Sequence, residues 1–327
     1  MKILITGASG FLGLHLTRHL RVTQPDAEIH SLGRSTSTHL AAMGVIQHQG
    51  SVTELADLQR VVPGMDAVYH LAGAVTRDKT AGPSVYKVHI DGTRNTLRAV
   101  ADAGITRVLV LSTSGTVGVS TDEDFMGHED SPVAWDLIQK WPYYESKAFA
   151  EKEIAQFVAR GLPVKVARPT LLLGPGDYQQ SSTGDVVKFL CGDIKAALPG
   201  GMSLVDARDV AAVLPALLDR GEPGVGYLLS ALNCSIREFL VLLEQASGVK
   251  APGFVLPRKL VTKAEGLMKW ASGLKSFGGL EAQTFEMGCH YWFLDASRAV
   301  RELGFHTRPV AETLADTVEF LRVKRGA

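Results

Sequence analysis

Cysteine is scarce in this chain, and its three cysteines lie far apart. Cys191, Cys234 and Cys289 form no CxxC pair and no zinc-ligand spacing, so we expect reduced thiols and no metal site. Neither sign of charge is in excess, because Lys and Arg together number 34 and Asp and Glu together also number 34. A formal net charge of zero argues against nucleic acid or an anionic membrane as a partner bound through bulk charge.

Long apolar runs are lacking as well. No stretch of about 18 consecutive apolar residues occurs, so the sequence predicts no membrane-spanning helix. Gly7 and Gly10 interrupt any signal-peptide core near the N-terminus, and no small-residue cleavage site follows. We therefore expect a cytoplasmic protein. Apolar residues nevertheless make up 46% of the 327 residues, which is enough to bury a sizeable core.

Strand-like apolar runs alternate with stretches of helical period in the first half of the chain. Such alternation predicts βαβ units, and hence an α/β fold with a Rossmann-type doubly wound parallel sheet, over residues 1–169. We expect a dinucleotide to bind beside the first strand, at the switch point of the sheet. The expected strands are 3–6, 28–32, 45–48, 67–71, 107–112 and 164–168, and the expected helices are 12–22, 53–61, 85–103 and 142–159.

The regular alternation of strand-like and helix-like segments ends after Pro169, at the turn-rich segment 174–177. We expect residues 170–327 to form mainly a smaller, interleaved C-terminal lobe that binds the substrate, with some later segments added to the sheet. A helix is expected near 208–219 and a strand near 227–230. The mildly amphipathic stretch 259–279 favours a core-facing helix over a membrane or partner surface.

Three glycines at a spacing of three follow the first apolar run. Gly7 would allow a tight turn, Gly10 would allow the backbone to approach a pyrophosphate, and Gly13 would let the next helix pack close to the strand. The free N–H groups of that helix N-terminus suit phosphate groups. A glycine-rich turn without a ligand is the alternative, and a second motif downstream favours nucleotide binding.

That second motif is the pair Tyr143 and Lys147, which share one face of a helix because they are four residues apart. A nearby ammonium group favours the phenolate and would bring the pKa of Tyr143, ordinarily about 10, closer to working pH. Thr113 and Ser114 follow the fifth strand, where a hydroxyl can bind the substrate oxygen. If strand geometry persists there, the two side chains point to opposite faces. The alternatives are an ordinary helix surface and a Ser/Thr turn.

Together these motifs resemble the extended short-chain dehydrogenase/reductases, in the branch of dihydroflavonol 4-reductase-like and NAD-dependent epimerase/dehydratase proteins. Further matching segments are 70–73, 91–95, 168–169, 174–177, 204–210, 294–298 and 302–305, so the resemblance runs along nearly the whole chain in order. It implies a catalytic set of Thr113, Tyr143 and Lys147, with Ser114 as a rival for the hydroxyl.

The resemblance also implies a set of cofactor-binding residues. At two positions this sequence departs from the family pattern. Lys147 would hold the nicotinamide ribose as well as lower the pKa of Tyr143. His89 stands where many relatives carry asparagine, which leaves a proton relay there open, and Ser51 replaces a common aspartate near the adenine. The expected cofactor-binding residues are Gly7, Ser9, Gly10, Phe11, Leu12, Gly13, Arg34, Ser51, Val52, Leu71, Ala72, Gly73, His89, Lys147, Pro169 and Thr170.

Arg34 decides the expected cofactor, because it stands at the end of the second strand where NAD-binding folds carry a carboxylate. An arginine there accommodates the 2′-phosphate of NADP, so we expect NADP(H), with NAD(H) as the alternative. Ser35 and Ser37 could add hydroxyl contacts. In such folds the two helices around 85–103 and 142–159 often form a homodimer face, and the apolar residues Val85, Val88, Phe149 and Ile154 would serve either that face or the core.

The expected reaction is hydride transfer between NADP(H) and a ketone or secondary alcohol on a largely apolar small molecule. Between residues 171 and 204 the only basic residues are Lys188 and Lys195, whereas a sugar-nucleotide epimerase or dehydratase, the second hypothesis, needs an arginine-rich diphosphate clamp. A 3β-hydroxysteroid-type dehydrogenase is a variant of the first hypothesis. A dinucleotide-binding sensor without turnover is the third, although such proteins tend to lose the Tyr or the Lys.

Overall fold

The computed structural model describes residues 1–75, 82–258, 276–277 and 280–326. Its centre is a seven-stranded parallel sheet with the strand order β3-β2-β1-β4-β5-β6-β9. The predicted Rossmann-type sheet is confirmed, and each of its six predicted strands is present to within one residue at either end. The strands are β1 (Lys2–Thr6), β2 (Glu28–Gly33), β3 (Ile46–Gln49), β4 (Ala67–His70), β5 (Val108–Leu111), β6 (Lys165–Pro169) and β9 (Gly226–Leu229).

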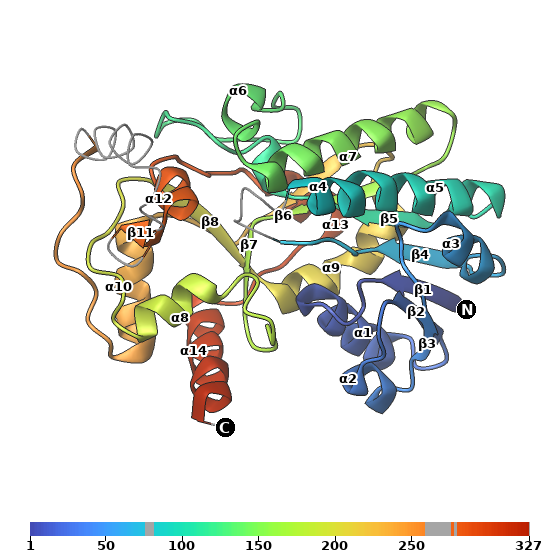
Figure 1. Cartoon of the computed structure of the whole chain (residues 1–327), viewed down its shortest axis with the longest axis horizontal. Coiled ribbons are helices and arrows are strands. Elements are labelled where there is room, and N and C mark those ends of the chain that lie inside the picture. Colours follow the sequence, from blue (N-terminus) through green and yellow to red (C-terminus); the bar gives the residue numbers. More distant parts are fainter. Residues whose placement is uncertain (76–81, 259–275, 278–279, 327) are drawn as a thin grey trace.

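Helices cover both faces of this sheet because its strands carry apolar side chains on both sides (Figure 1). Along β1, Leu4 belongs to one core, whereas Ile3 and Ile5 belong to the other. The Leu4 core is covered by α3 (Leu55–Val61), α5 (Gly92–Asp102) and α7 (Pro142–Ala159), and the opposite core by α1 (Phe11–Thr23), α2 (Thr38–Ala42), α9 (Ala207–Arg220) and α13 (Ser297–Leu303).

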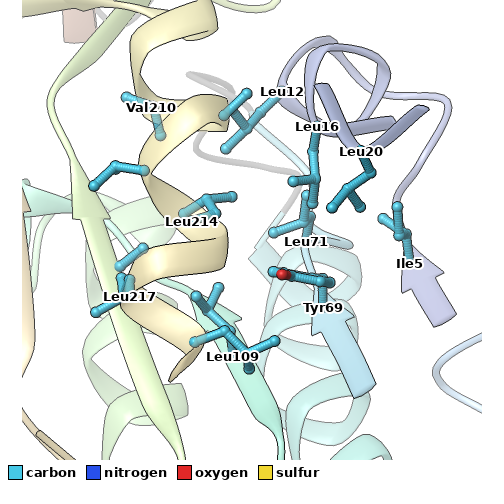
Figure 2. Packing of buried hydrophobic residues seen from close by; sticks show 14 of the residues in the cluster. Ile5, Leu12, Leu16, Leu20, Tyr69, Leu71, Leu109, Val210, Leu214 and Leu217 are labelled. Atoms are coloured by element: carbon cyan, nitrogen blue, oxygen red, sulfur yellow. The ribbon is translucent and has the colours of Figure 1, made fainter. Parts of the chain in front are cut away.

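The core on the α1 side depends on a segment from the second half of the chain. Leu12, Leu16 and Leu20 recur every four residues, so they form one apolar stripe along α1. Figure 2 shows this stripe beside Leu214 and its neighbours on α9, with Tyr69 and Leu109 of the sheet between the two helices. Strand β9 also comes from beyond residue 169, and it pairs with β6 at the edge of the large sheet.

A smaller layer lies beside the sheet and holds a third apolar core (Figure 1). Its three-stranded sheet has the order β10-β8-β7 and was not predicted from the sequence. The strands are β7 (Leu171–Leu173), β8 (Gly201–Asp206) and β10 (Leu232–Ser235), packed by α8 (Gly184–Leu190), α10 (Ile236–Ser247) and α14 (Val310–Gly326). Further short elements are α6 (Trp135–Ile138), β11 (Ser276–Phe277), β12 (Leu280–Glu281) and α12 (Ala282–Met287).

The single helix predicted over 85–103 is wrong in detail. The chain instead forms α4 (Gly82–Tyr86), a π-helical turn named η2 (Lys87–Asp91) and then α5. A π turn inserts one extra residue into a helix, and it commonly occurs at functional sites. Here it carries the buried His89.

The structure also assigns some residues whose role the sequence left open. Val85 and Ile154 are buried in the chain itself, which leaves them no part in an exposed dimer face. The helix predicted over 259–279 lies outside the described residues, apart from the two residues of β11. None of the described helices is long and apolar enough to cross a membrane.

Candidate active site

The glycine turn joins β1 to α1 at the carboxyl edge of the large sheet. Gly7 has a φ of 74°, and a Cβ atom there would lie 2.6 Å from the backbone nitrogen of Ala72, which follows β4. A Cβ atom on Gly13 would lie 2.2 Å from the carbonyl oxygen of Gly7. Only glycine therefore fits either position without a shift of the backbone.

The start of α1 has the features of an anion-binding site. Gly10 is the N-cap and offers no side chain to the first turn, which also contains no acidic residue. The N–H groups of the first turn are therefore available to a ligand, and the helix dipole favours a negative charge there. These residues fit the pyrophosphate of a dinucleotide. Most of the other expected cofactor-binding residues follow β2, β3, β4 and β6, whose carboxyl ends share this edge.

The end of β2 carries no carboxylate. Arg34 is exposed directly after the strand. The acidic residue of β2, Glu28, lies at the opposite end of the strand and contacts Lys2 and His30. Beside Ala8 and Ser9, Ser35 and Thr36 line a small hollow. The Ser37 hydroxyl accepts a hydrogen bond from the backbone N–H of Leu40 and caps α2, which leaves its O–H donor for the expected contact.

Tyr143 and Lys147 lie on one face of α7, which starts at Pro142 as predicted. The Tyr143 hydroxyl is hydrogen-bonded to the side chain of Thr113. Nζ of Lys147 donates to the carbonyl oxygen of Leu111, the last residue of β5, at 2.7 Å. The structure therefore brings three of the expected catalytic residues together at the end of β5.

Thr113 and Ser114 do not point to opposite faces, as an extended strand would require. Strand β5 ends at Leu111, and Ser114 begins a 3-10 turn named η3 (Ser114–Thr116), with Thr113 as its N-cap. Thr113 is still extended, but the chain turns at Ser114, and both residues line the same cavity. The Thr113 hydroxyl accepts from the backbone N–H of Gly115 at 3.4 Å and also bonds Tyr143.

Burial controls the protonation of the Tyr–Lys pair. It raises the pKa of Tyr143 to about 12, and the hydrogen bond from Thr113 opposes the rise. Burial lowers the pKa of Lys147 to about 8, against the attraction of the Glu151 carboxylate. The lower pKa expected for Tyr143 is therefore absent in the protein alone, because loss of hydration outweighs any help from the lysine.

His89 has a fixed tautomer and no ring nitrogen left for a proton relay. Its Nε2 accepts a hydrogen bond from the backbone N–H of Ala74 at 3.1 Å, so the proton is on Nδ1. Nδ1 then donates to Oγ of Ser146 at 2.8 Å, and Ser146 donates to the carbonyl oxygen of Tyr143. Burial lowers the pKa of His89 to about 2, which keeps the ring neutral. His89 therefore positions α7 beside the π turn.

A buried ion pair behind the Tyr–Lys pair was not foreseen from the sequence. The Arg168 guanidinium donates two hydrogen bonds of 2.9 Å to the Glu151 carboxylate, and both side chains are 12% exposed. Ser112 donates to the same carboxylate. The available signal was the spacing, since Glu151 lies one helical turn beyond Lys147. This pair ties α7 to the ends of β5 and β6.

A cavity of about 290 Å³ opens next to Thr113, Ser114 and Tyr143. Among the described residues its lining is mostly aliphatic and aromatic, and it includes no lysine, arginine or histidine. The apolar lining comes from β7, α10, α12 and the segment around Trp292. No group of three His, Cys, Asp or Glu side chains in the described part of the chain could hold a metal ion. The three cysteines are free thiols.

Comparison with known proteins gives one family and relatives of full length. The model of the NAD dependent epimerase/dehydratase family matches residues 3–228. Sterol demethylase protein B of Methylococcus capsulatus is 28% identical over 100% of this chain and 99% of its own. A putative dihydroflavonol 4-reductase of Synechocystis sp. is 28% identical over 97% and 94%, respectively.

A solved structure with a bound dinucleotide has the same fold. It is a double mutant of DesIV, a dTDP-glucose 4,6-dehydratase from Streptomyces venezuelae, with NAD and DAU bound. It superposes with a TM-score of 0.77 at 25% identity, covering 100% of this chain and 98% of that one. Since the family model spans well over half of the sequence, this chain belongs to the NAD dependent epimerase/dehydratase family and is an NAD(P)-dependent enzyme of the extended short-chain dehydrogenase/reductase type.

Proposed function

We propose that this protein is an NADP(H)-dependent oxidoreductase that transfers a hydride between nicotinamide and a ketone or secondary alcohol on a largely apolar small molecule. One observation carries the proposal. The Tyr143 hydroxyl, hydrogen-bonded to Thr113, meets a cavity whose described lining is mostly apolar and holds no cationic side chain. Such a cavity favours an uncharged apolar ligand over a diphosphate.

The residues at the carboxyl edge of the sheet fit a dinucleotide with a 2′-phosphate. The first turn of α1 would bind the pyrophosphate, and Arg34 with the Ser35 hydroxyl would bind the 2′-phosphate. Lys147 has two N–H groups beyond its bond to Leu111, and these suit the ribose hydroxyls. When bound, the cofactor supplies the hydride and, in its oxidised form, a positive charge on the nicotinamide ring.

Tyr143 acts as the proton donor in the direction of reduction. Because its pKa is about 12, the phenol stays protonated at neutral pH and can give its proton to the substrate oxygen. The Thr113 hydroxyl stabilises the phenolate that is left. Lys147, with a pKa of about 8 and one helical turn away, is the group that returns a proton to the site.

The names of the relatives and the pairing of Arg208 both favour a substrate without a diphosphate. One relative carries a sterol in its name and another a dihydroflavonol, and both are uncharged ring systems without a phosphate. A sugar-nucleotide enzyme, like the DesIV neighbour, would need cations for a second diphosphate. Arg208, the first arginine after β7, instead binds the carboxylates of Asp206 and Asp316.

Oxidation of NADPH with a panel of apolar ketones, beside UDP- and dTDP-sugars, tests this function. We expect turnover with ketones, and a loss of about 10²- to 10⁴-fold in Tyr143→Phe with cofactor affinity retained. Tyr178→Phe is the matched control, since Tyr178 is exposed and stacks on His39, away from the cavity. Turnover of sugar nucleotides without reduction of any ketone would overturn the proposal in favour of an epimerase or dehydratase.

The cofactor preference has its own test in Arg34. A charge-assisted contact to phosphate is worth about 1.5–3 kcal/mol, so Arg34→Ala should weaken NADPH binding roughly 10- to 100-fold and leave NADH binding unchanged. Titration of protein fluorescence gives both dissociation constants. Arg98→Ala, which removes an exposed arginine paired with Asp102 on α5, is the control. Equal affinities for NADPH and NADH in the unaltered protein would contradict the preference.

A further inference from the structure

Gln283 places a buried amide in the wall of the cavity without a matching partner. Its residue is 4% exposed, it lines the cavity, and its Oε1 has no hydrogen-bond partner among the described residues. The amide nitrogen meets only the sulfur of Met287, at 3.9 Å, and a thioether is a weak acceptor. Burying such an amide opposes folding, so a role outside folding has to account for it.

A row of aromatic rings connects Tyr143 to the helix that carries the Gln283 amide. The rings of Tyr143 and Tyr144 are 5.0 Å apart, and those of Tyr144 and Trp292 are 4.9 Å apart. Nε1 of Trp292 then donates to the carbonyl oxygen of Met287, one helical turn from Gln283. A ligand that reaches from the Tyr143 hydroxyl to the Gln283 amide therefore passes along an apolar wall.

Helix α12 holds the amide in place. Phe285 is 1% exposed and packs in a cluster with Leu198 and Cys289, which anchors the helix. Two of the hydroxyl groups in the lining have partners within the protein. Oγ of Ser181 bonds the Asp177 carboxylate, and Oγ of Ser203 bonds Asn233.

We propose that Gln283 is a specificity-determining residue that binds a hydroxyl group of the substrate, remote from the carbonyl that is reduced. An amide offers both an acceptor and donors, and a hydroxyl can pair with either one whichever way the amide is turned. An anionic group is disfavoured, because the described lining has no cation to balance it. The inference rests on the proposed function and narrows its substrate class to apolar hydroxyketones.

Tetralone and its ring-hydroxylated derivatives are the probes, and Gln283→Leu is the variant. We expect the unaltered protein to reduce at least one hydroxytetralone with a kcat/KM about 10-fold or more above that of tetralone. Gln283→Leu should abolish this difference by lowering kcat/KM for the hydroxytetralone alone. Its melting temperature should stay equal or rise, because the variant removes an unpaired buried polar group.

Gln24→Leu is the matched control. The Gln24 Oε1 is also buried without a partner in the described structure, but Gln24 is the C-cap of α1 and does not line the cavity. Its variant should keep the hydroxyl preference. If Gln283→Leu slows tetralone and hydroxytetralone equally, or lowers the melting temperature, Gln283 serves packing and the inference is overturned.

Binding separates this inference from the proposed function. Calorimetric titration of the same probes into the protein without NADPH reports the hydroxyl preference independently of turnover. If the protein binds the hydroxylated probe more tightly and Gln283→Leu removes this difference, the inference is supported even when no ketone is reduced. A lack of ketone reduction counts against the proposed function instead. Absence of any hydroxyl preference, in binding and in turnover, overturns the inference.

Discussion

At the scale of single residues, two neighbouring hydroxyls differ in what they touch. Thr113 bonds the Tyr143 hydroxyl, whereas Ser114 shares the cavity wall at the start of a 3-10 turn. Thr113→Val keeps the shape of the side chain and removes its hydroxyl, so we expect kcat to fall by about 10²-fold or more. Steady-state kinetics with NADPH and a reducible ketone measures the loss.

The companion variants decide whether the hydroxyl or the packing matters. Thr113→Ser restores the hydroxyl without the methyl group and should retain most of the activity. Ser114→Ala should cost much less than Thr113→Val, because the structure gives no bond from Ser114 to the Tyr143 hydroxyl. The reverse order of losses would assign the catalytic hydroxyl to Ser114.

Lys147 should make the stability of the fold depend on pH in a defined direction. Burial lowers its pKa from 10.5 to about 8, so between these values the unfolded chain binds a proton that the folded protein has released. The free energy of unfolding should therefore increase as pH rises above about 8. Lys147 should account for up to about 1.4 kcal/mol of this increase per pH unit.

Comparison with Lys147→Met isolates this contribution. The difference in unfolding free energy, unaltered protein minus variant, should increase from about pH 7 to about pH 9.5 in urea titrations. Lys152→Met, an exposed lysine on the same helix, is the control. A difference that stays constant or decreases over this range would show that Lys147 is not buried as a charged group.

Residue types and spacing were sufficient to predict that Thr113, Tyr143 and Lys147 lie together, but not how they are protonated. The four-residue interval placed Tyr143 and Lys147 on one helix face. The high pKa of Tyr143 depends on how deeply tertiary packing buries the phenol, which spacing does not contain. The roles of His89 and Gln283 were equally hidden, because each follows from partners brought close only by folding.

At the scale of elements, strands buried on both faces were the easiest to predict. Segments such as Val108–Leu111 are continuous apolar runs, whereas the edge strand β3 has the sequence IQHQ and no buried residue. Strand β7 has three residues and is separated from β6 by Thr170 alone, so its pattern merges with that of its neighbour. The π turn at His89 lies between two α-helices without a break in the helical chain, so one continuous helix was predicted there.

The contact between α1 and β1 predicts the effect of a single methyl group. In Gly13→Ala the new Cβ atom would lie 2.2 Å from the carbonyl oxygen of Gly7, so α1 must move away from the turn. Overpacking of this kind costs about 1–3 kcal/mol, and the displaced helix N-terminus should bind NADPH more weakly. Thermal unfolding and fluorescence titration measure the two effects.

Gly253→Ala is the control for the added methyl group, because nothing lies within 4 Å of a Cβ atom there. It should change neither stability nor cofactor affinity beyond a few tenths of a kcal/mol. Gly13→Ala with unaltered stability and NADPH affinity would mean that α1 is not packed against the glycine turn.

At the scale of the whole molecule, the parallel sheet depends on both halves of the sequence. The predicted division at residue 169 rests on the end of the strand–helix alternation. That pattern does not show which later segments return to the sheet. Val210, Leu214 and Leu217 of α9 cover the apolar stripe of α1, and β9 pairs with β6 (Figures 1 and 2). Removing α9 would uncover the buried side chains of Leu12 and Leu16, which face it in Figure 2.

This dependence predicts that residues 1–169 do not fold alone, although they contain six of the seven strands of the large sheet. Each large apolar side chain that loses its cover forfeits about 1.5–3 kcal/mol, so a few of them equal the whole stability of a typical domain. Circular dichroism during heating should show no cooperative transition for this fragment, and the dye ANS should bind it. A fragment of residues 1–230, which regains α9 and β9, should recover a cooperative transition. A monomeric 1–169 fragment that unfolds cooperatively would show instead that the first half forms an independent domain, with α9 packed on it as an addition.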